Sequence, residues 1–255
     1  MRVWCVANQN SGAGKTTTAI ALAGLLTEKN KRVLLVDTDP HASLTAYLNY
    51  DPANVTHSLF DLFHLSNIDK KSLDKVIINT SFAGLDLLNA HISLATLDQV
   101  MGSKNGMGLV LKQALGRIEG EYDFVLIDSP PVLGVMMINA LVASDRILIP
   151  VPTNFLALKG LERMLQTLRI MQKSQQARFN ISIVPTMFDR QNRTSLETLQ
   201  TLKARYDRQV WASVIPFDSK IRDASLQGVP PSLFAKGCRG VYAYKMLLPY
   251  LERLE

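Results

Sequence analysis

The 255-residue sequence predicts an α/β fold in which helices cover both faces of a mostly parallel, twisted sheet. Several segments are nearly continuous runs of Val, Ile and Leu, which is typical of strands buried on both faces. These runs alternate along the chain with segments of helical periodicity. No linker, repeat or long charge run interrupts the alternation. We therefore expect residues 1–255 to form a single domain.

The alternation gives the expected elements in order. Strands are predicted at residues 3–7, 32–37, 85–88, 124–128, 146–151, 179–185 and 209–215. Helices are predicted at residues 16–28, 58–64, 70–76, 108–119, 139–143, 156–175, 194–206 and 240–254. In such a sheet a ligand is expected at the carboxyl ends of the parallel strands.

A glycine-rich turn joins the first strand to the first helix. Residues 12–16 read Gly-Ala-Gly-Lys-Thr. Glycines let backbone N–H groups turn toward phosphate oxygens, and the start of the following helix adds partial positive charge. Lys15 can reach the β- and γ-phosphates, and the Thr16 hydroxyl is a natural Mg²⁺ ligand. The segment therefore predicts a phosphate-binding loop, although the standard loop has glycine where this chain has Gln9.

Carboxylates follow two of the predicted strands. Asp37 and Asp39 come at the end of one strand, and Asp128 ends another. If these strands neighbour the first, the carboxylates lie beside the phosphate loop. Hydrolysis of a phosphoanhydride needs one carboxylate that holds Mg²⁺ through water and one that polarises the attacking water. The combination predicts a Mg²⁺-dependent nucleotide hydrolase.

Composition excludes several other classes. No apolar stretch is long enough for a signal peptide or a membrane span. Cys5 and Cys238 have no paired spacing, which indicates a reducing cytosol and excludes a disulfide scaffold. The histidines lack ligand-like spacing, so they are interpreted as surface or loop residues: His41, His57, His64 and His91.

The net charge of +6 is unevenly distributed. Residues 1–151 hold 12 Lys/Arg against 14 Asp/Glu, whereas residues 152–255 hold 16 against 8. A basic C-terminal half suggests a polyanionic partner, such as nucleic acid or an anionic membrane. Solvated helix faces would give the same imbalance, so both interpretations stay open.

Residues 10–16 align with a variant loop, Lys-Gly-Gly-x-Gly-Lys-Thr, and here the sequence resembles the ParA/MinD family of P-loop ATPases. The likeness runs along nearly the whole chain. Residues 33–40 look like the family's switch I region, and residues 122–134 look like its Walker B and switch II regions. Further similar segments are residues 139–151, 155–161, 184–190 and 214–225.

The resemblance implies roles for individual residues. Lys15 would bind phosphate, Thr16 would ligate Mg²⁺, Asp39 would activate water and Asp128 would hold Mg²⁺ through water, with Asp37 a weaker candidate for the outer Mg²⁺ shell. The loop and three positions near adenine give the implied ATP-binding set: Gln9, Asn10, Ser11, Gly12, Ala13, Gly14, Lys15, Thr16, Thr17, Met187, Pro216 and Phe217.

Asn10 departs from the family pattern. There a signature lysine reaches across an ATP-sandwich homodimer to the partner's phosphates, and Asn10 is uncharged and too short to replace it. Three interpretations stay open: slow hydrolysis with Lys15 alone, an ATP-binding switch with impaired turnover, or a different cation. Lys159 is the candidate, because the family usually has an acidic residue there; it is equally a solvated helix lysine.

The resemblance also implies partners. ParA dimers bind DNA without sequence preference, and the corresponding segments here carry Arg190, Arg193, Lys203, Arg205, Arg208, Lys220 and Arg222. MinD-like relatives instead end in a membrane helix. Residues 243–255 contain Pro249, Glu252 and Glu255, and are interpreted as a helix packed on the sheet. The expected protein is cytoplasmic and nucleoid-associated, with an adaptor or centromere-binding-type protein that stimulates hydrolysis. Its cargo is a plasmid, a chromosome or a protein assembly. Residues 37–45 weakly resemble ParA-like proteins of chemotaxis arrays.

Overall fold

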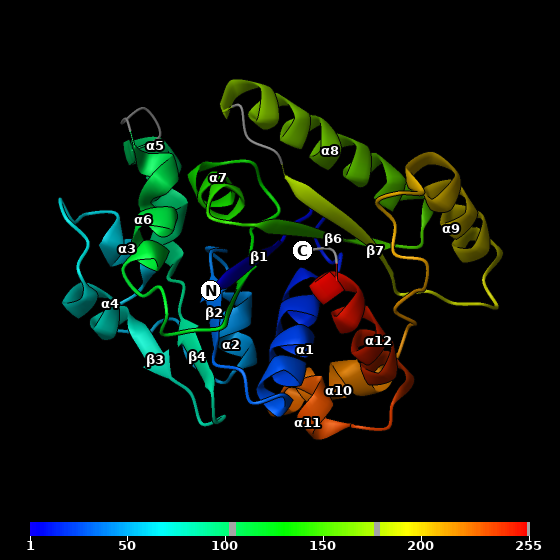
Figure 1. Ribbon diagram of the computed structural model, residues 1–255, viewed down its shortest axis with the longest axis horizontal. Helices are drawn as coiled ribbons and strands as arrows, with labels where there is room; N and C mark the ends of the chain where they lie inside the picture. The colour runs from blue at the N-terminus through cyan, green and yellow to red at the C-terminus, as the bar shows by residue number, and fades with distance from the viewer. Residues whose placement is uncertain (102–105, 176–178, 254–255) are drawn as a thin grey trace.

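The computed structural model describes residues 1–101, 106–175 and 179–253 (Figure 1). Within these ranges one sheet has the strand order β3-β4-β2-β5-β1-β6-β7. Neighbouring strands run parallel, except that β3 at one edge is antiparallel to β4. The strands are β1 (Arg2–Val6), β2 (Val33–Asp37), β3 (Ile77–Asn79), β4 (Leu85–Leu88), β5 (Phe124–Asp128), β6 (Arg146–Pro152) and β7 (Asn180–Thr186).

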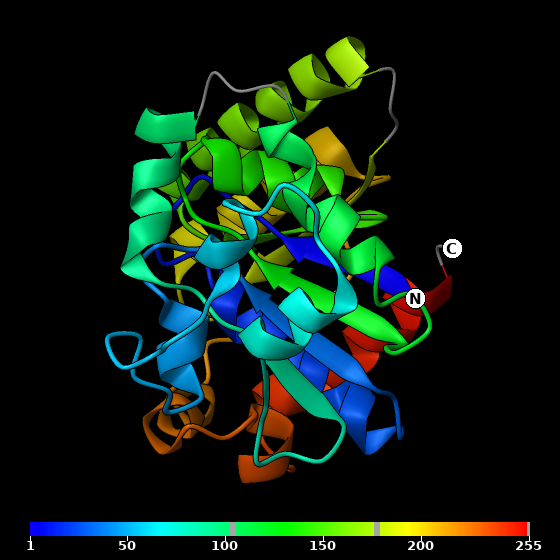
Figure 2. The same cartoon turned by 90° about the vertical axis from the view of Figure 1, so that its left-hand side faces the viewer.

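Helices cover both faces of this sheet, as Figures 1 and 2 show. Successive side chains of β1 point to opposite faces, so Val3 and Cys5 enter one core while Trp4 and Val6 enter the other. The first core lies under α3 (Leu59–Leu62), α4 (Lys70–Val76), α5 (Leu97–Met101), α6 (Val110–Gly116), α7 (Val135–Val142), α8 (Phe155–Gln175) and α9 (Arg193–Tyr206). The second lies under α1 (Lys15–Glu28), α2 (Ser43–Tyr47), α10 (Ser219–Gln227), α11 (Pro231–Phe234) and α12 (Arg239–Arg253). The α/β fold predicted from the sequence is therefore confirmed.

Helix α1 is buried along most of its length because it lies between the sheet and two further helices. Its residues from Thr18 to Leu26 are all buried, and it contacts both α11 and α12. Gly24 permits the close approach of α11. A Cβ atom at this position would lie 2.7 Å from both Pro230 Cβ and Ser232 Oγ. Helix α1 is thus held between the sheet and these two helices.

Most helices and strands predicted from the sequence are present in the structure. The strands at 85–88 and 124–128 and the helix at 70–76 have the predicted bounds. The helix at 58–64 shrinks to the single turn of α3, and that at 108–119 is a 3₁₀ turn, Met107–Leu109, followed by α6. The short elements α2, α5, α10, α11 and β3 and the 3₁₀ turn Ile92–Thr96 were not predicted. Of the helix predicted at 240–254, residue 254 lies outside the described ranges, as does Glu255.

The strand predicted at residues 209–215 is wrong. The segment runs beside β7 but makes only isolated bridges, Val210 with Ile183 and Pro216 with Phe188. Pro185 of β7 has no N–H to donate, so a continuous ladder cannot form on this side. The chain bends at residues 212 and 213, and this bend lets the segment continue toward the carboxyl end of the sheet.

Candidate nucleotide-binding site

The phosphate loop connects β1 to α1 and is held by its own side chains. The Asn8 side chain donates to the Pro150 carbonyl (2.7 Å) and accepts from the Asn10 N–H (2.9 Å). Gly12 and Gly14 have φ angles of 71° and 89°, in the left-handed region that favours glycine. The Thr186 hydroxyl of β7 donates to the Ala13 carbonyl (3.2 Å). The loop is therefore shaped before any ligand arrives.

Lys15 lies across the loop. Its side chain is only 8% exposed, and Nζ donates to the Asn10 carbonyl (3.3 Å). Burial lowers the pKa of this amine, while the Asp128 and Asp39 carboxylates act in the opposite direction. A cation held by one weak contact to a carbonyl is free to turn to an anion in the loop.

A cavity of about 480 Å³ opens beside the loop. The structure brings the sequence-predicted residues Ser11 to Thr17, Asp39 and Met187 to its wall, together with His41, Ser43 and Pro131. Gln9 and Asn10, which the sequence also assigned to ATP, do not line it. The Gln9 side chain instead donates to the Thr167 hydroxyl of α8 (2.8 Å). The lining of the phosphate cavity therefore does not support the expected contact of Gln9 and Asn10 with the nucleotide.

Asp128 stands where β5 ends, and β5 is the neighbour of β1. The Thr16 hydroxyl donates to its Oδ2 (2.6 Å), and the carboxylate is almost fully buried. Oδ1 is buried as well and has no hydrogen-bond partner within the described residues. Burial, followed by the nearby Asp37 charge, raises the pKa of Asp128 to about 8. An orphaned carboxylate oxygen next to a threonine hydroxyl fits the oxygen ligands and bound water that Mg²⁺ prefers.

Both carboxylate oxygens of Asp37 accept hydrogen bonds from the protein. Its Oδ2 accepts from the backbone N–H and the hydroxyl of Thr45 (both 2.8 Å), and its Oδ1 accepts from the Asp39 N–H (3.1 Å). Burial raises the pKa of Asp37 to about 6. Asp37 thus holds α2 and the turn that carries Asp39, and its place in the outer Mg²⁺ shell stays a prediction.

Asp39 is less buried than the other two carboxylates. It lines the phosphate cavity, and its Oδ1 accepts from the His41 N–H (3.0 Å). It also borders a second cavity of about 240 Å³, which α7 and the 3₁₀ turn Ile92–Thr96 help to form. This position at the edge of the phosphate cavity is open to a water molecule.

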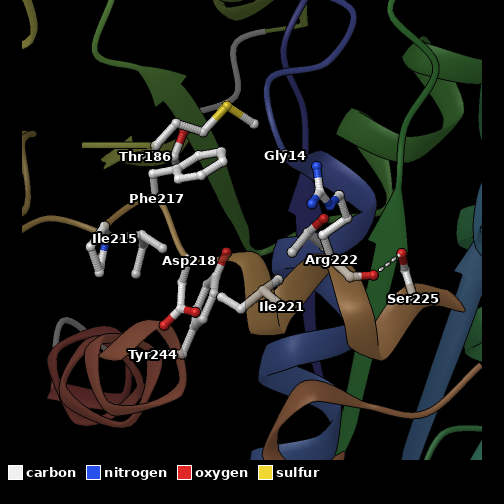
Figure 3. Close-up of a pocket in the computed structure, with 12 residues that line it drawn as sticks. Gly14, Thr186, Ile215, Phe217, Asp218, Ile221, Arg222, Ser225 and Tyr244 are labelled. Carbon is white, nitrogen blue, oxygen red and sulfur yellow. Dashed lines mark hydrogen bonds between the residues drawn. The ribbon is translucent and has the colours of Figure 1, made fainter. Parts of the chain in front are cut away.

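A third cavity, of about 270 Å³, lies on the other side of the loop (Figure 3). Its wall is mostly apolar, with Ile215, Pro216, Phe217 and Ile221, and it shares Gly14, Thr17 and Met187 with the phosphate cavity. Met187, Pro216 and Phe217 thus lie together as expected. The sequence missed the contributions of Asp218, Ile221, Ser225 and Tyr244. One local signal was available: the Asp218 side chain accepts from the Lys220 N–H and so starts α10 directly after Phe217.

Lys159 is exposed on α8 and does not line the phosphate cavity of its own chain. Its neighbour Gly160 packs directly on the loop, where an added Cβ would lie 3.2 Å from Asn10 Cβ. The structure thus brings Lys159 to the side of the loop on which Asn10 stands.

The basic residues predicted to bind DNA fall into two groups. Arg193 pairs with Glu197, Arg205 with Glu162 and Lys220 with Asp223, and Lys203 donates to the Ala212 carbonyl. The other three are exposed and form no ion pair within the described part of the chain: Arg190, Arg208 and Arg222. Arg222 additionally lines the apolar cavity.

The C-terminal helix is packed on the fold, as the sequence predicts. Seven residues of α12 are buried, among them Tyr244, whose hydroxyl forms a hydrogen bond with that of Thr18 (3.0 Å). None of the described helices is both long enough and apolar enough to span a membrane. The described residues also contain no cluster of His, Cys, Asp or Glu that would hold a metal by itself.

A glycine loop between β1 and α1, a lysine across it and a Thr–Asp pair at the neighbouring strand end define a P-loop nucleotide-binding protein. A family model described as "AAA domain" matches residues 1–182. The chain is 33% identical to the sporulation initiation inhibitor protein Soj of Bacillus subtilis, covering 95% of both chains. It therefore belongs to the ParA/Soj/MinD family of P-loop ATPases.

Solved structures agree with this assignment. A Mycobacterium smegmatis protein named cobyrinic acid a,c-diamide synthase, with bound ADP and magnesium, has a TM-score of 0.82 at 31% identity. The match covers 99% of this chain and 94% of that one. A putative plasmid partition protein of Borrelia burgdorferi, bound to AMPPNP, has a TM-score of 0.81 at 25% identity and covers 99% of both chains.

Proposed function

We propose that this protein is a ParA-like ATPase that binds ATP with Mg²⁺, dimerises in the ATP state, binds DNA without sequence preference and positions a cargo. The observation that carries the proposal is the continuity of the site. The apolar cavity and the phosphate cavity share Gly14, Thr17 and Met187 in their walls, and Thr16 and Asp128 lie beside the loop. That is the shape of a nucleoside triphosphate with its metal.

Each group has a role that follows from its place. The apolar cavity takes the base, with Met187 and Phe217 beside it. Loop N–H groups and Lys15 neutralise the phosphates. Thr16 and Asp128 would hold Mg²⁺, which neutralises charge on the phosphate oxygens. Asp39, at the edge of the phosphate cavity, orients the attacking water and takes up its proton.

The ATP-dependent dimer would complete the phosphate site from outside. Asn10 leaves the loop without a second lysine, and Lys159 stands exposed beside it on α8. We infer that Lys159 of one protomer supplies the missing charge to the phosphates of its partner. If it does not, two candidates remain: slow hydrolysis with Lys15 alone, or an ATP-binding switch with impaired hydrolysis.

DNA would bind to the exposed arginines that form no ion pair within the described part of the chain. Arg190 and Arg208 meet this condition without lining a cavity described above. Contacts of this kind go to DNA phosphates, so affinity is independent of sequence and falls steeply with salt. The protein would then be nucleoid-associated in the cytoplasm. An adaptor that stimulates hydrolysis would link it to its cargo, which is a plasmid, a chromosome or a protein assembly.

DNA binding tests this proposal directly. Binding to two unrelated duplexes of equal length is measured by fluorescence anisotropy with ATP and with ADP, over a series of salt concentrations. We expect equal affinities for both duplexes in ATP, loss of binding in ADP, and a log–log salt slope of about −0.9 per phosphate contact.

Matched variants locate the surface. The double variant Arg190→Glu/Arg208→Glu should weaken binding to both duplexes alike, whereas Arg193→Glu, whose arginine is already paired with Glu197, should have a much smaller effect. Lys15→Ala should bind no DNA in ATP. Binding to anionic vesicles in ATP without binding to DNA would contradict the proposal and favour a MinD-like protein.

A further inference from the structure

The phosphate cavity adjoins the apolar cavity and also the cavity next to α7. This order predicts which way a bound nucleotide points. The apolar cavity and the phosphate cavity share Gly14, Thr17 and Met187. At its other end the phosphate cavity shares Asp39, His41 and Pro131 with the cavity next to α7. If the base occupies the apolar cavity, as the proposed function requires, the terminal phosphate lies toward Asp39, His41 and Pro131.

That end of the site carries more negative than positive charge. Asp39 lines it, and Asp98 lines the adjoining cavity. Among the described residues that line the phosphate cavity, Lys15 is the one permanent cation. A terminal phosphate adds further negative charge there. His41 is the one other side chain in that lining able to carry a positive charge.

The turn that carries His41 is fixed by its backbone. The His41 N–H donates to Asp39 Oδ1 (3.0 Å), and the Ala42 N–H donates to the Asp39 carbonyl (2.8 Å). The imidazole makes no hydrogen bond within the described part of the chain, and the residue is exposed. A ring on a fixed turn, with both nitrogens unused, is available to an incoming anion.

We propose that His41 is a specificity-determining residue that donates a hydrogen bond to the terminal phosphate and so lets the site discriminate ATP from ADP. The Asp39 turn connects the two functions. The group that orients water and the group that detects the third phosphate are joined by the hydrogen bond from the His41 N–H to the Asp39 carboxylate.

Calorimetric titration of the full-length protein with ATPγS and with ADP, both with Mg²⁺, tests this inference. His41→Ala should weaken ATPγS binding about tenfold, because a hydrogen bond to a charged phosphate is lost. ADP binding should stay within about twofold of the wild type, because ADP does not reach this end of the site. His41→Gln keeps an N–H donor and should recover part of the loss. His64→Ala removes an exposed histidine outside both cavities and should change neither affinity.

The outcomes separate this inference from the proposed function. An equal loss of ATPγS and ADP binding in His41→Ala would show that the residue only shapes the loop, and no loss would show that it does not contact the phosphate. Either result overturns the assignment of His41 while leaving the nucleotide site intact. Failure of the wild type to bind either nucleotide would instead overturn the proposed function.

Discussion

At the scale of single residues, Asp39 and Asp128 have different surroundings. Asp128 is almost fully buried at the end of β5, whereas Asp39 lines the phosphate cavity. The structure places the Thr16 hydroxyl 2.6 Å from the Asp128 carboxylate. Asp37, the weaker candidate in sequence, differs from Asp128 because its Oδ2 accepts two hydrogen bonds from Thr45, and a strand end does not reveal such bonds.

Asp39 and Asp128 should be separable by experiment. Asp39→Ala should lower the ATP turnover rate about 10²-fold or more while nucleotide affinity is retained, because a group that orients water acts mainly in the chemical step. Asp128→Asn keeps an acceptor for the Thr16 hydroxyl but removes the charge. It should raise the Mg²⁺ concentration needed for half-maximal turnover about tenfold or more.

Turnover measured against Mg²⁺ concentration, with ATP saturating, distinguishes the two. If Asp128→Asn shows a normal Mg²⁺ dependence, Asp128 does not hold the metal. If Asp39→Ala hydrolyses ATP at the wild-type rate, a different group orients the water.

At the scale of elements, the sequence predicted what is local and missed what depends on neighbours. Helix α7 begins at Val135, four residues before the prediction, because Asp98 of α5 accepts a hydrogen bond from the Val135 N–H (2.6 Å). The helical periodicity of residues 139–143 cannot predict that contact, because it comes from a different helix. The apolar cavity likewise depends on α12, which contacts both α1 and α10, so that Ile221 and Tyr244 share a cavity with Thr17 from distant parts of the chain.

The packing of α11 on α1 predicts a stability effect. Gly24→Ala places a Cβ 2.7 Å from Pro230 and Ser232, so it should lower the free energy of unfolding by about 1–3 kcal/mol despite the better helix propensity of alanine. Gly116→Ala, in α6, meets no atom within 4 Å and should be neutral or raise it by about 0.5–1 kcal/mol. Urea denaturation compares the two, and equal effects would refute the close-packing argument.

The approach of α8 to the loop predicts a coupling between Asn10 and Lys159. Lys159→Ala should weaken ATP-dependent dimerisation more than Asn10→Ala, and Asn10→Lys should restore part of the loss, because lysine has the stem and the point charge to reach a partner's phosphates. Arg163→Ala, one turn further along α8 and also exposed, is the matched control.

A double-mutant cycle of dimerisation constants provides the measurement. Independent sites should add to within about 0.5 kcal/mol. A dimerisation constant that is unchanged in Lys159→Ala would place Lys159 on a solvated helix face.

For the molecule as a whole, the sequence was sufficient for the fold and for the family. Apolar strands alternating with helices predicted the parallel sheet, and the loop motif placed the site at its carboxyl edge. Three residues of the expected basic surface form exposed ion pairs with Glu197, Glu162 and Asp223, and the DNA-binding role of this surface stays a prediction. Two of these pairs each lie within a single helix, at i,i+4 and i,i+3 spacing, whereas Arg205–Glu162 joins α9 to α8 and could not be predicted from the sequence.

ATP-dependent dimerisation is the central claim, because the trans cation and the DNA surface both depend on it. Sedimentation velocity of Asp39→Ala, which should retain ATP without hydrolysing it, tests this most directly. The account predicts a dimer of about twice the 28.3 kDa chain mass in ATP with Mg²⁺, and a monomer in ADP. A variant that binds ATP yet sediments as a monomer at all protein concentrations would contradict it.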